Sequence, residues 1–200
     1  MGARVLVVLA GARKHGLGHH LCEVVLEALG QSGATVIVQD LLADGFDPVL
    51  RLDDGAAHAT EPDRDNDPLA ARYARDLRLA DAVILIHPVW WFAPPALLKG
   101  WVDRILVHGV ALEQQIKGAP VGLLTQTKML VVQTFNSSAQ IDRVLFLGIS
   151  GFFWKHVVGL PTGIQRVRRL ALYGVEKLTP RRLQKFEQRL VRSVRALAKS

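Results

Sequence analysis

Short apolar runs alternate with helically spaced apolar residues along most of this 200-residue chain. The runs at Arg4–Leu9, Thr35–Val38 and Ala82–Ile86 are rich in β-branched residues and leucine. Runs with so little polar interruption are typical of strands that are covered on both faces, as in a parallel sheet. Two more runs, Lys128–Thr134 and Val167–Val175, bring the expected strands to five.

Helical periodicity fills the segments between these runs. A first helix follows the first strand, and residues 69–80 form a second. A third begins at Pro95, which suits the first helical position because proline has no amide hydrogen to lose. The expected buried faces of the first and third helices are Leu21, Val25 and Leu29, and Leu97, Trp101 and Ile105.

The last helix and the strand order complete the predicted fold. Thr179 is the expected N-cap, followed by Pro180, and an apolar helical region ending near Val158 follows the fourth strand. Five strands with interleaved helices predict an α/β fold of the flavodoxin-like type, a three-layer sandwich with parallel strand order 2-1-3-4-5. One domain is expected over residues 1–200, and the polar stretch 51–68 is expected to form a mobile loop. The inner face of the last helix is expected at Leu183, Phe186, Leu190, Val194 and Leu197.

Charge is distributed unevenly along the chain. The formal net charge is +7, and residues 164–200 hold eleven Lys or Arg against two Glu, so the rest of the chain is slightly acidic. A solvated helix face is the simplest explanation, and we expect no nucleic-acid partner. Weak association of the basic C-terminal helix with anionic membrane surfaces is an alternative that the sequence leaves open.

Cysteine usage and the N-terminus bear on the compartment. Cys22 is the only cysteine, so an internal disulfide is excluded, and it has no partner for a metal site. The apolar run within residues 1–10 is too short for a secretory signal. We therefore expect a cytoplasmic protein without a metal centre.

Three loops are predicted to meet at one edge of the sheet. In such folds, ligands bind beyond the carboxyl ends of the strands, where the strand order reverses. The first loop, AGARKHGLGHH (10–20), leads into a helix whose N-terminal amides attract anions, and Arg13, Lys14 and His19 add positive charge. This turn alone is a weak motif, since many α/β proteins that bind no phosphate have one.

The other two loops carry aromatic and polar groups. PVWWFAPP (88–95) follows the third strand, and its aromatic rings either pack into the core or form a wall against a flat heteroaromatic ligand such as a flavin. QTFNSS (133–138) follows the fourth strand with amides and hydroxyls that suit the polar edge of such a ring. It is the coincidence of the three loops that favours a flavin site.

Four stretches, VLVVLAGARKHGLGHHL, DLLADGFDPVL, PVWWFAPPALLKGWVDRIL and RLALYGV, occur here in a specific order and spacing. In these the chain resembles the flavodoxin-like NAD(P)H:quinone oxidoreductases of the DT-diaphorase type, over nearly its whole length. The resemblance implies a homodimer that binds FMN or FAD, uses NAD(P)H as co-substrate, and transfers two electrons to quinones or similar flat electrophiles.

The resemblance also implies cofactor-binding residues by position. The flavin phosphate would be held by Gly16, Leu17, Gly18 and His19. The isoalloxazine would be lined by Pro88, Val89, Trp90, Trp91 and Phe92, and its pyrimidine side would contact Thr134, Phe135 and Asn136. The two tyrosines, Tyr73 and Tyr173, fall in a predicted helix and strand, so no catalytic acid or base is assigned.

The chain also departs from the family pattern. Gly16 and Gly18 stand where the family commonly has hydroxyl residues, and Gln133–Asn136 replaces Thr-Thr-Gly-Gly, which brings Phe135 toward the space of the ring. These departures leave a flavin-free pseudoenzyme as one alternative. Another is a flavin-binding ancillary or regulatory subunit of a membrane transporter, docked through the basic helix and the apolar stretch 145–164. The choices between FMN and FAD, between NADH and NADPH, and among acceptors remain open from sequence.

Overall fold

The computed structural model describes residues 2–11, 13, 15–51, 66–113, 119 and 121–199. A five-stranded parallel sheet runs through its centre in the order β2-β1-β3-β6-β7, which confirms the predicted order 2-1-3-4-5. The strands are β1 (Arg4–Leu9), β2 (Thr35–Asp40), β3 (Ala82–Pro88), β6 (Lys128–Thr134) and β7 (Arg166–Leu172). The short β4 (Leu112–Glu113) and β5 (Val121–Gly122) form a separate antiparallel pair.

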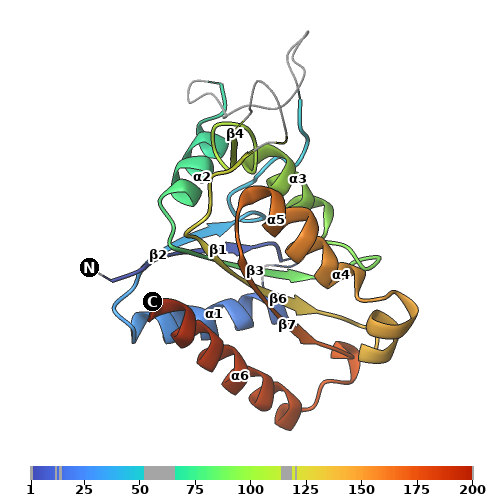
Figure 1. Ribbon diagram of the computed structural model, residues 1–200. Helices are drawn as coiled ribbons and strands as arrows, with labels where there is room; N and C mark the ends of the chain where they lie inside the picture. The colour runs from blue at the N-terminus through green and yellow to red at the C-terminus, as the bar shows by residue number, and fades with distance from the viewer. Residues whose placement is uncertain are drawn as a thin grey trace.

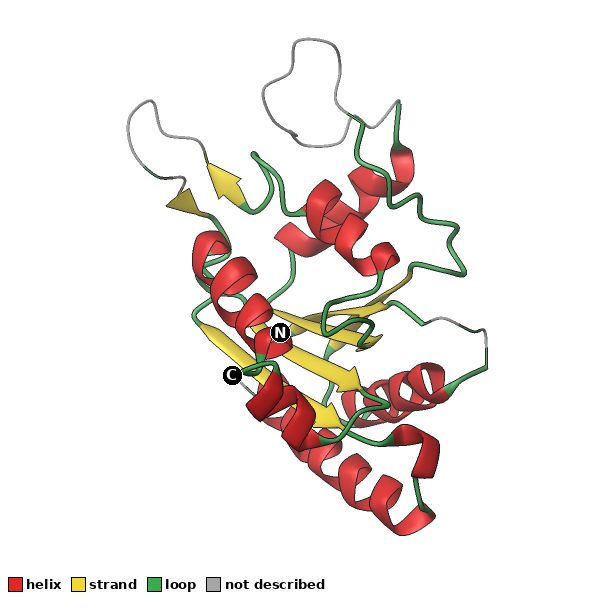
Figure 2. Ribbon diagram, turned by 90° about the vertical axis from the view of Figure 1, so that its right-hand side faces the viewer, coloured by secondary structure: helices red, strands yellow, loops and turns green. Residues whose placement is uncertain are grey.

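Helices cover both faces of the sheet (Figures 1 and 2). One face carries α1 (Leu17–Gly30) and α6 (Pro180–Ala198). The other carries α2 (Pro68–Arg78), α3 (Ala96–Ile105) and the irregular helical segment 141–162. That segment consists of η1 (Ile141–Leu145), α4 (Ile149–Phe152), η2 (Phe153–Gly159) and α5 (Leu160–Thr162), and the 3₁₀ turn η3 (Val175–Lys177) follows β7.

The core divides according to the alternation of side chains along each strand. In β1, Val5, Val7 and Leu9 pack under α1 and α6, whereas Leu6 and Val8 pack toward α2 and α3. The other central strands β3 and β6 alternate in the same way. Because both faces are buried, these strands contain few polar residues, which is why the sequence pattern located them.

Several predicted boundaries need correction. Pro95 is the N-cap of α3 rather than its first residue, and Leu98 takes the buried position expected for Leu97, which is only partly buried. Strand β7 ends at Leu172 instead of continuing to Val175, because Gly174 turns the chain with a φ of 60°. Residues 52–65 of the predicted mobile loop lie outside the described residues.

The strand register brings the three predicted loops together. Leu9 of β1 lies beside Ile86 of β3, Pro88 of β3 beside Thr134 of β6, and Thr134 beside Leu172 of β7. The carboxyl ends of these strands therefore meet at one edge of the sheet. Within the described part of the chain, no helix is both long and apolar enough to cross a membrane.

Candidate functional site

A cavity of about 630 Å³ opens at this edge of the sheet. Loops after β1, β3, β6 and β7 form its walls, as expected for the switch point of a doubly wound sheet. Ten of the twelve predicted site residues line it: Gly16, Leu17, Gly18, His19, Pro88, Val89, Trp90, Trp91, Thr134 and Asn136.

The N-terminus of α1 forms one end of the cavity. Gly16 is the N-cap and supplies no side-chain hydrogen bond, and the first turn contains no acidic residue. The first intrahelical bond is donated by the His20 amide to the Gly16 carbonyl at 3.1 Å, so the amides of residues 17–19 precede the bonding pattern of the helix. This part of the cavity therefore offers N–H groups that have no intrahelical partner, together with the positive end of a helix dipole, to an anion.

His19 adds a directed polar group to the same end. Its Nε2 donates to Asp40 Oδ2 at 3.1 Å, which fixes the ring, while its buried Nδ1 has no hydrogen-bond partner among the residues that the structure describes. A Cβ on Gly11 would lie 3.1 Å from His19 Cε1, so the absence of a side chain at Gly11 is what gives the imidazole its space. A buried ring nitrogen without a partner, in the wall of a cavity, fits a ligand that carries hydrogen-bonding oxygens.

A tight aromatic turn forms another part of the cavity wall. Trp90 and Ala93 exchange two backbone hydrogen bonds of 3.1 and 3.0 Å, and the two residues between them, Trp91 and Phe92, have φ of 51° and 57°. Positive φ at both central residues is the type I′ conformation, which normally favours Asn or Gly. The Trp91 side chain is 97% exposed and that of Trp90 is 57% exposed, so the turn presents aromatic surface without burying it.

Two predicted site residues do not line the cavity. Phe92 turns away from it and stacks on Phe146 at 3.8 Å between ring centroids. Phe135 is almost fully buried and packs against Tyr173 at 4.7 Å, with the Arg169 guanidinium 5.3 Å from its ring centroid. The side chain of Phe135 therefore leaves the cavity open instead of filling it.

A buried polar network lies directly beneath the lining residues. His87 Nδ1 donates to the Pro88 carbonyl at 2.7 Å, and its Nε2 lies 3.3 Å from the amide nitrogen of Gln133. Arg169 donates to Gln133 Oε1 and, at 2.8 Å, to Asp142 Oδ2. These contacts tie the residues before Pro88 and Thr134 to strand β7 and to the segment 141–162.

Asp142 is fully buried and accepts several of the hydrogen bonds of this network. The Tyr173 hydroxyl donates to Asp142 Oδ2 at 2.7 Å and the Ser150 hydroxyl to Asp142 Oδ1 at 3.1 Å. Burial raises the pKa of Asp142, but the hydrogen bonds from Arg169 and Tyr173 outweigh it and hold that pKa below its usual range. Burial and the bond to Asp142 raise the pKa of Tyr173, so its hydroxyl is engaged with Asp142 as a neutral donor.

His87 is held neutral by its surroundings. Burial lowers its pKa to about 4, and the charge of Arg169 acts in the same direction, against the hydrogen bond to the Pro88 carbonyl. With Nδ1 donating, Nε2 is the acceptor for Gln133. A neutral histidine with a defined tautomer therefore supports the aromatic loop from below.

Of the four other lining residues, Gly11 and Arg13 belong to the predicted first loop, and sequence reasoning missed Val175 and Glu176. They follow β7 directly, and the rule that ligands bind beyond the carboxyl ends of strands would have included them. Glu176 Oε1 accepts a hydrogen bond from Asn136 Nδ2 at 3.0 Å, which closes the cavity on the side of β7. Among the described residues, no group of three His, Cys, Asp or Glu could hold a metal ion.

The arrangement suits a flat ring with an anionic tail. The anion-binding end, the aromatic wall and the hydrogen-bonding groups of Thr134 and Asn136 lie around a single cavity. Among the described lining residues, the titratable side chains are Arg13, His19 and Glu176, of which His19 is bonded to Asp40 and Glu176 to Asn136.

Comparisons with known proteins agree with the geometry. The Flavodoxin_2 family, described as having a flavodoxin-like fold, matches residues 3–194. The NAD(P)H dehydrogenase [quinone] 1 of Rattus norvegicus is 32% identical over 122 residues, which cover 54% of this chain and 44% of that protein. The chain spans about half the length of the curated relatives it matches.

Solved structures resemble the chain over nearly its full length. Smu.1420 from Streptococcus mutans UA159 has a TM-score of 0.82 at 26% identity, covering 96% of this chain and 99% of that one. An FMN-dependent NADH-azoreductase from Bacillus anthracis, solved in complex with FMN, has a TM-score of 0.78 at 18% identity, covering 98% of this chain and all of that one, 100%. At 18% identity, the azoreductase resembles this chain in its fold alone.

Proposed function

The chain belongs to the Flavodoxin_2 family, and from this premise we propose that it is a flavin-dependent NAD(P)H oxidoreductase. It would transfer two electrons from NAD(P)H through bound FMN or FAD to a quinone or a similar flat electrophile. The observation that carries the proposal is that one cavity is lined both by the N-terminus of α1 and by the strained aromatic turn. The relative from Rattus norvegicus supports the nicotinamide donor and the quinone acceptor by its name.

In the proposed mechanism, the flavin supplies the hydride-accepting ring and the protein supplies its position. The amides at the start of α1 and the His19 imidazole would hold the phosphate. Trp90 and Trp91 would pack against the ring, and Thr134 and Asn136 would hydrogen-bond its pyrimidine edge. Donor and acceptor would then use the same open face in turn, so the protein needs no acid or base of its own.

We further propose that the protein is a cytoplasmic homodimer. The segment 141–162 exposes large apolar side chains. It contacts the aromatic turn through the stack of Phe146 on Phe92. An exposed apolar surface of this kind favours association with a second copy. Cys22, a free and buried thiol, agrees with a reducing compartment.

Replacing Gly16 tests the proposed phosphate end. Gly16 has the extended backbone of an N-cap, and a Cβ there would make only ordinary contacts, the nearest at 3.7 Å from Arg13 Cβ. In Gly16→Asp the carboxylate would occupy the same amides that the proposal gives to the phosphate. Stability should rise by roughly 0.5 kcal/mol, while flavin affinity falls at least about tenfold.

The matched control is Gly16→Ser, which also caps the helix but brings no charge. It should keep flavin affinity within about threefold of the wild type, since a hydroxyl can share the amides with a phosphate. Flavin binding is measured by fluorescence quenching and stability by thermal unfolding. Equal flavin affinities for Gly16→Asp and Gly16→Ser would contradict a phosphate at this helix end.

A further inference from the structure

The solvent-exposed side of α6 is strongly basic. The helix packs against the core through Phe186, Leu190 and Val194, which are buried. Its outward side carries Lys or Arg at spacings of three or four residues from Arg181 to Lys199, so these side chains project in one direction. This row of cations is roughly 27 Å long, because a helix rises about 1.5 Å per residue.

The edge strand β7 continues this positive surface. Arg166 and Arg168 are exposed and lie on the same side of the strand as its buried leucines, which pack under α1 and α6. Arg166 lines a hollow of about 510 Å³ together with Leu197 of α6, which links the strand to the helix. Asp81 also lines this hollow, and its carboxylate accepts a hydrogen bond from the Arg4 amide at 2.7 Å.

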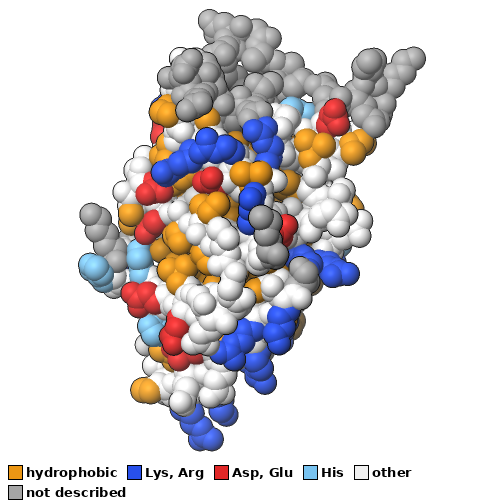
Figure 3. Space-filling view, turned by 90° about the vertical axis from the view of Figure 1, so that its left-hand side faces the viewer, with side chains coloured by type: hydrophobic (Ala, Val, Ile, Leu, Met, Phe, Trp, Pro, Cys, Tyr) orange, Lys and Arg blue, Asp and Glu red, His pale blue; other side chains and the backbone are white. Residues whose placement is uncertain are grey.

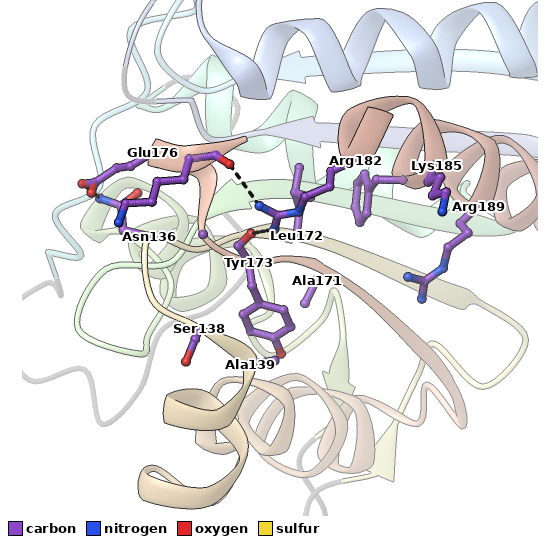
Figure 4. Close-up of a pocket in the computed structure, with 13 residues that line it drawn as sticks. Asn136, Ser138, Ala139, Ala171, Leu172, Tyr173, Glu176, Arg182, Lys185 and Arg189 are labelled. Atoms are coloured by element: carbon purple, nitrogen blue, oxygen red, sulfur yellow. Dashed lines mark hydrogen bonds between the residues drawn. The ribbon is translucent and has the colours of Figure 1, made fainter. Parts of the chain in front are cut away.

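We call the combined surface of α6 and β7 the basic face. Figure 4 shows Arg182, Lys185 and Arg189 along one side of α6, and Figure 3 shows Lys and Arg gathered on the lower part of the molecule, where α6 lies in Figure 1. The basic face consists of Arg166, Arg168, Arg181, Arg182, Lys185, Arg189, Arg192, Arg195 and Lys199. Within the described part of the chain, none of these side chains forms an ion pair.

The two acidic side chains of residues 164–200 are engaged elsewhere. Glu187 is hydrogen-bonded to His20 of α1 at 2.6 Å. Glu176 accepts a hydrogen bond from Asn136 at 3.0 Å beside the candidate flavin cavity. The basic face therefore keeps its positive charge toward solvent, where it attracts extended polyanions.

The surroundings of the basic face favour an anionic lipid bilayer over a nucleic acid. Single-stranded nucleic acids are bound through exposed aromatic rings on which bases stack, whereas Tyr173 is half-buried and Phe186 is buried. Entry of α6 into a groove of duplex DNA would bring the exposed Glu23 and Glu27 of the neighbouring α1 against the phosphates. A planar bilayer needs only the outward side of α6 and the edge of the sheet at β7.

We propose that the basic face docks the protein on anionic lipid bilayers. The negative potential of such a surface attracts Lys and Arg side chains that lie within a Debye length, about 10 Å in 0.1 M salt. Among the described residues, no large apolar side chain of α6 is exposed, so the attachment is electrostatic and reversible, without insertion into the bilayer. Docking would hold the candidate flavin cavity near the bilayer, because Val175 and Glu176 of its wall come shortly before α6.

Sedimentation with extruded vesicles tests the docking directly. The wild type should pellet with vesicles of phosphatidylcholine and phosphatidylglycerol, mixed at about three to one, in about 0.05 M salt. It should stay in the supernatant with vesicles of phosphatidylcholine alone. Its affinity for the mixed vesicles should fall at least about tenfold in about 0.5 M salt, because salt screens the attraction.

A triple variant removes charge from the basic face without touching the candidate flavin cavity. Arg181, Arg192 and Lys199 are exposed, and none of them lines that cavity. The variant Arg181→Gln, Arg192→Gln, Lys199→Gln should bind the mixed vesicles about a hundredfold more weakly than the wild type.

The matched control removes the same charge from α2, on the opposite face of the sheet. The variant Arg72→Gln, Arg75→Gln, Arg78→Gln alters exposed side chains of that helix. Its affinity for the mixed vesicles should stay within about threefold of the wild type. Equal losses in the two triple variants would overturn the inference, because binding would then follow net charge and not the basic face.

Two further outcomes would also overturn the inference. One is a wild type that does not pellet with the mixed vesicles at low salt. The other is tighter binding to a DNA duplex than to the mixed vesicles at the same salt, which would assign the basic face to nucleic acid. Vesicle binding needs neither flavin nor turnover, so its failure leaves the proposed function intact, and failure to bind flavin leaves the docking intact.

Discussion

Backbone strain at single residues is concentrated around the candidate cavity. Trp91, Phe92 and Leu147 are the non-glycine residues with positive φ among the described residues. Trp91 and Phe92 form the aromatic turn, and Leu147 follows Phe146, which stacks on Phe92. Left-handed backbone in bulky residues costs about 1–3 kcal/mol each and persists where the site requires the side chain.

Replacing Trp91 should therefore separate stability from binding. In Trp91→Asn the new residue suits the type I′ turn, and almost no buried surface is lost because the indole is 97% exposed. We predict a free energy of unfolding higher by about 1 kcal/mol and a flavin affinity roughly tenfold lower, since ring stacking is lost. Denaturant unfolding and flavin titration measure the two quantities.

The conservative variant Trp91→Phe keeps both the strain and an aromatic face. Its flavin affinity should stay within about threefold of the wild type, with stability unchanged. If Trp91→Asn bound flavin as tightly as Trp91→Phe, the indole would have no part in the wall of the site.

The buried His87 makes stability depend on pH. Its pKa of about 4 in the folded protein lies below the ordinary value of 6.5. Between these values the unfolded chain binds a proton that the folded protein does not, so stability falls as pH falls through this window. The loss should amount to roughly 3 kcal/mol and be complete near pH 4.

The variant His87→Asn checks this dependence. Asparagine retains a donor for the Pro88 carbonyl but does not titrate, although the smaller side chain lowers stability at neutral pH. Urea unfolding at pH 7 and pH 4 should show the wild type losing about 3 kcal/mol more than the variant over this interval. Parallel losses in the two proteins would rule out His87 as the titrating group.

At the scale of elements, the sequence allowed prediction of the sheet but not of the segment 141–162. The central strands are covered on both faces, so their apolar runs are uninterrupted and easy to locate. The segment 141–162 winds largely as π-helix, and Asp142, Ser150 and Arg169 hold it through a buried network. No local periodicity encodes contacts between residues so far apart in sequence, so the apolar stretch indicated only a helical region.

The candidate site was predictable to the extent that it depends on strand ends. The residues after β1, β3 and β6 were located because parallel strands bring their carboxyl ends together. The directions of Phe92 and Phe135 were not, because each depends on a distant partner, Phe146 for the first and Tyr173 for the second. Their roles were carried over from family positions, which do not specify where a ring points.

The Arg169–Asp142 pair should contribute strongly to the attachment of the segment 141–162. Asp142→Asn would leave the partly buried Arg169 without its countercharge, and we predict a loss of about 3 kcal/mol in unfolding free energy. The control Asp103→Asn breaks the exposed Lys99–Asp103 pair and should cost less than about 0.5 kcal/mol. Similar losses of unfolding free energy in both variants would show that the buried pair stabilises the fold no more than the exposed pair does.

On the scale of the whole molecule, exposed apolar surface is concentrated on one segment. Large exposed side chains of the segment 141–160 are Ile141, Val144, Leu145, Phe146, Leu147, Ile149, Phe152, Val157 and Leu160. Such a concentration beside the aromatic turn is what a second copy would cover. This segment holds two basic residues, Arg143 and Lys155, whereas α6 holds six Lys or Arg.

Charge placed on this apolar surface should therefore separate the proposed dimer. We predict that Leu145→Asp, Leu160→Asp sediments as a monomer of 22.0 kDa, whereas the wild type has twice that mass. The control Leu79→Asp alters an exposed leucine at the end of α2 and should leave the dimer intact. A wild type that sediments as a monomer at micromolar concentration would contradict the proposed assembly.

The central claim, that this fold positions a flavin for reaction with NAD(P)H, is tested most directly by visible absorption. The purified protein is incubated with FMN or FAD, freed of excess cofactor, and mixed anaerobically with NADPH or NADH before a quinone is added. The account predicts flavin bands shifted from those of the free cofactor, bleached by the nicotinamide and restored by the quinone. A protein that retains neither flavin, or retains one that NADPH and NADH leave unbleached, would contradict it.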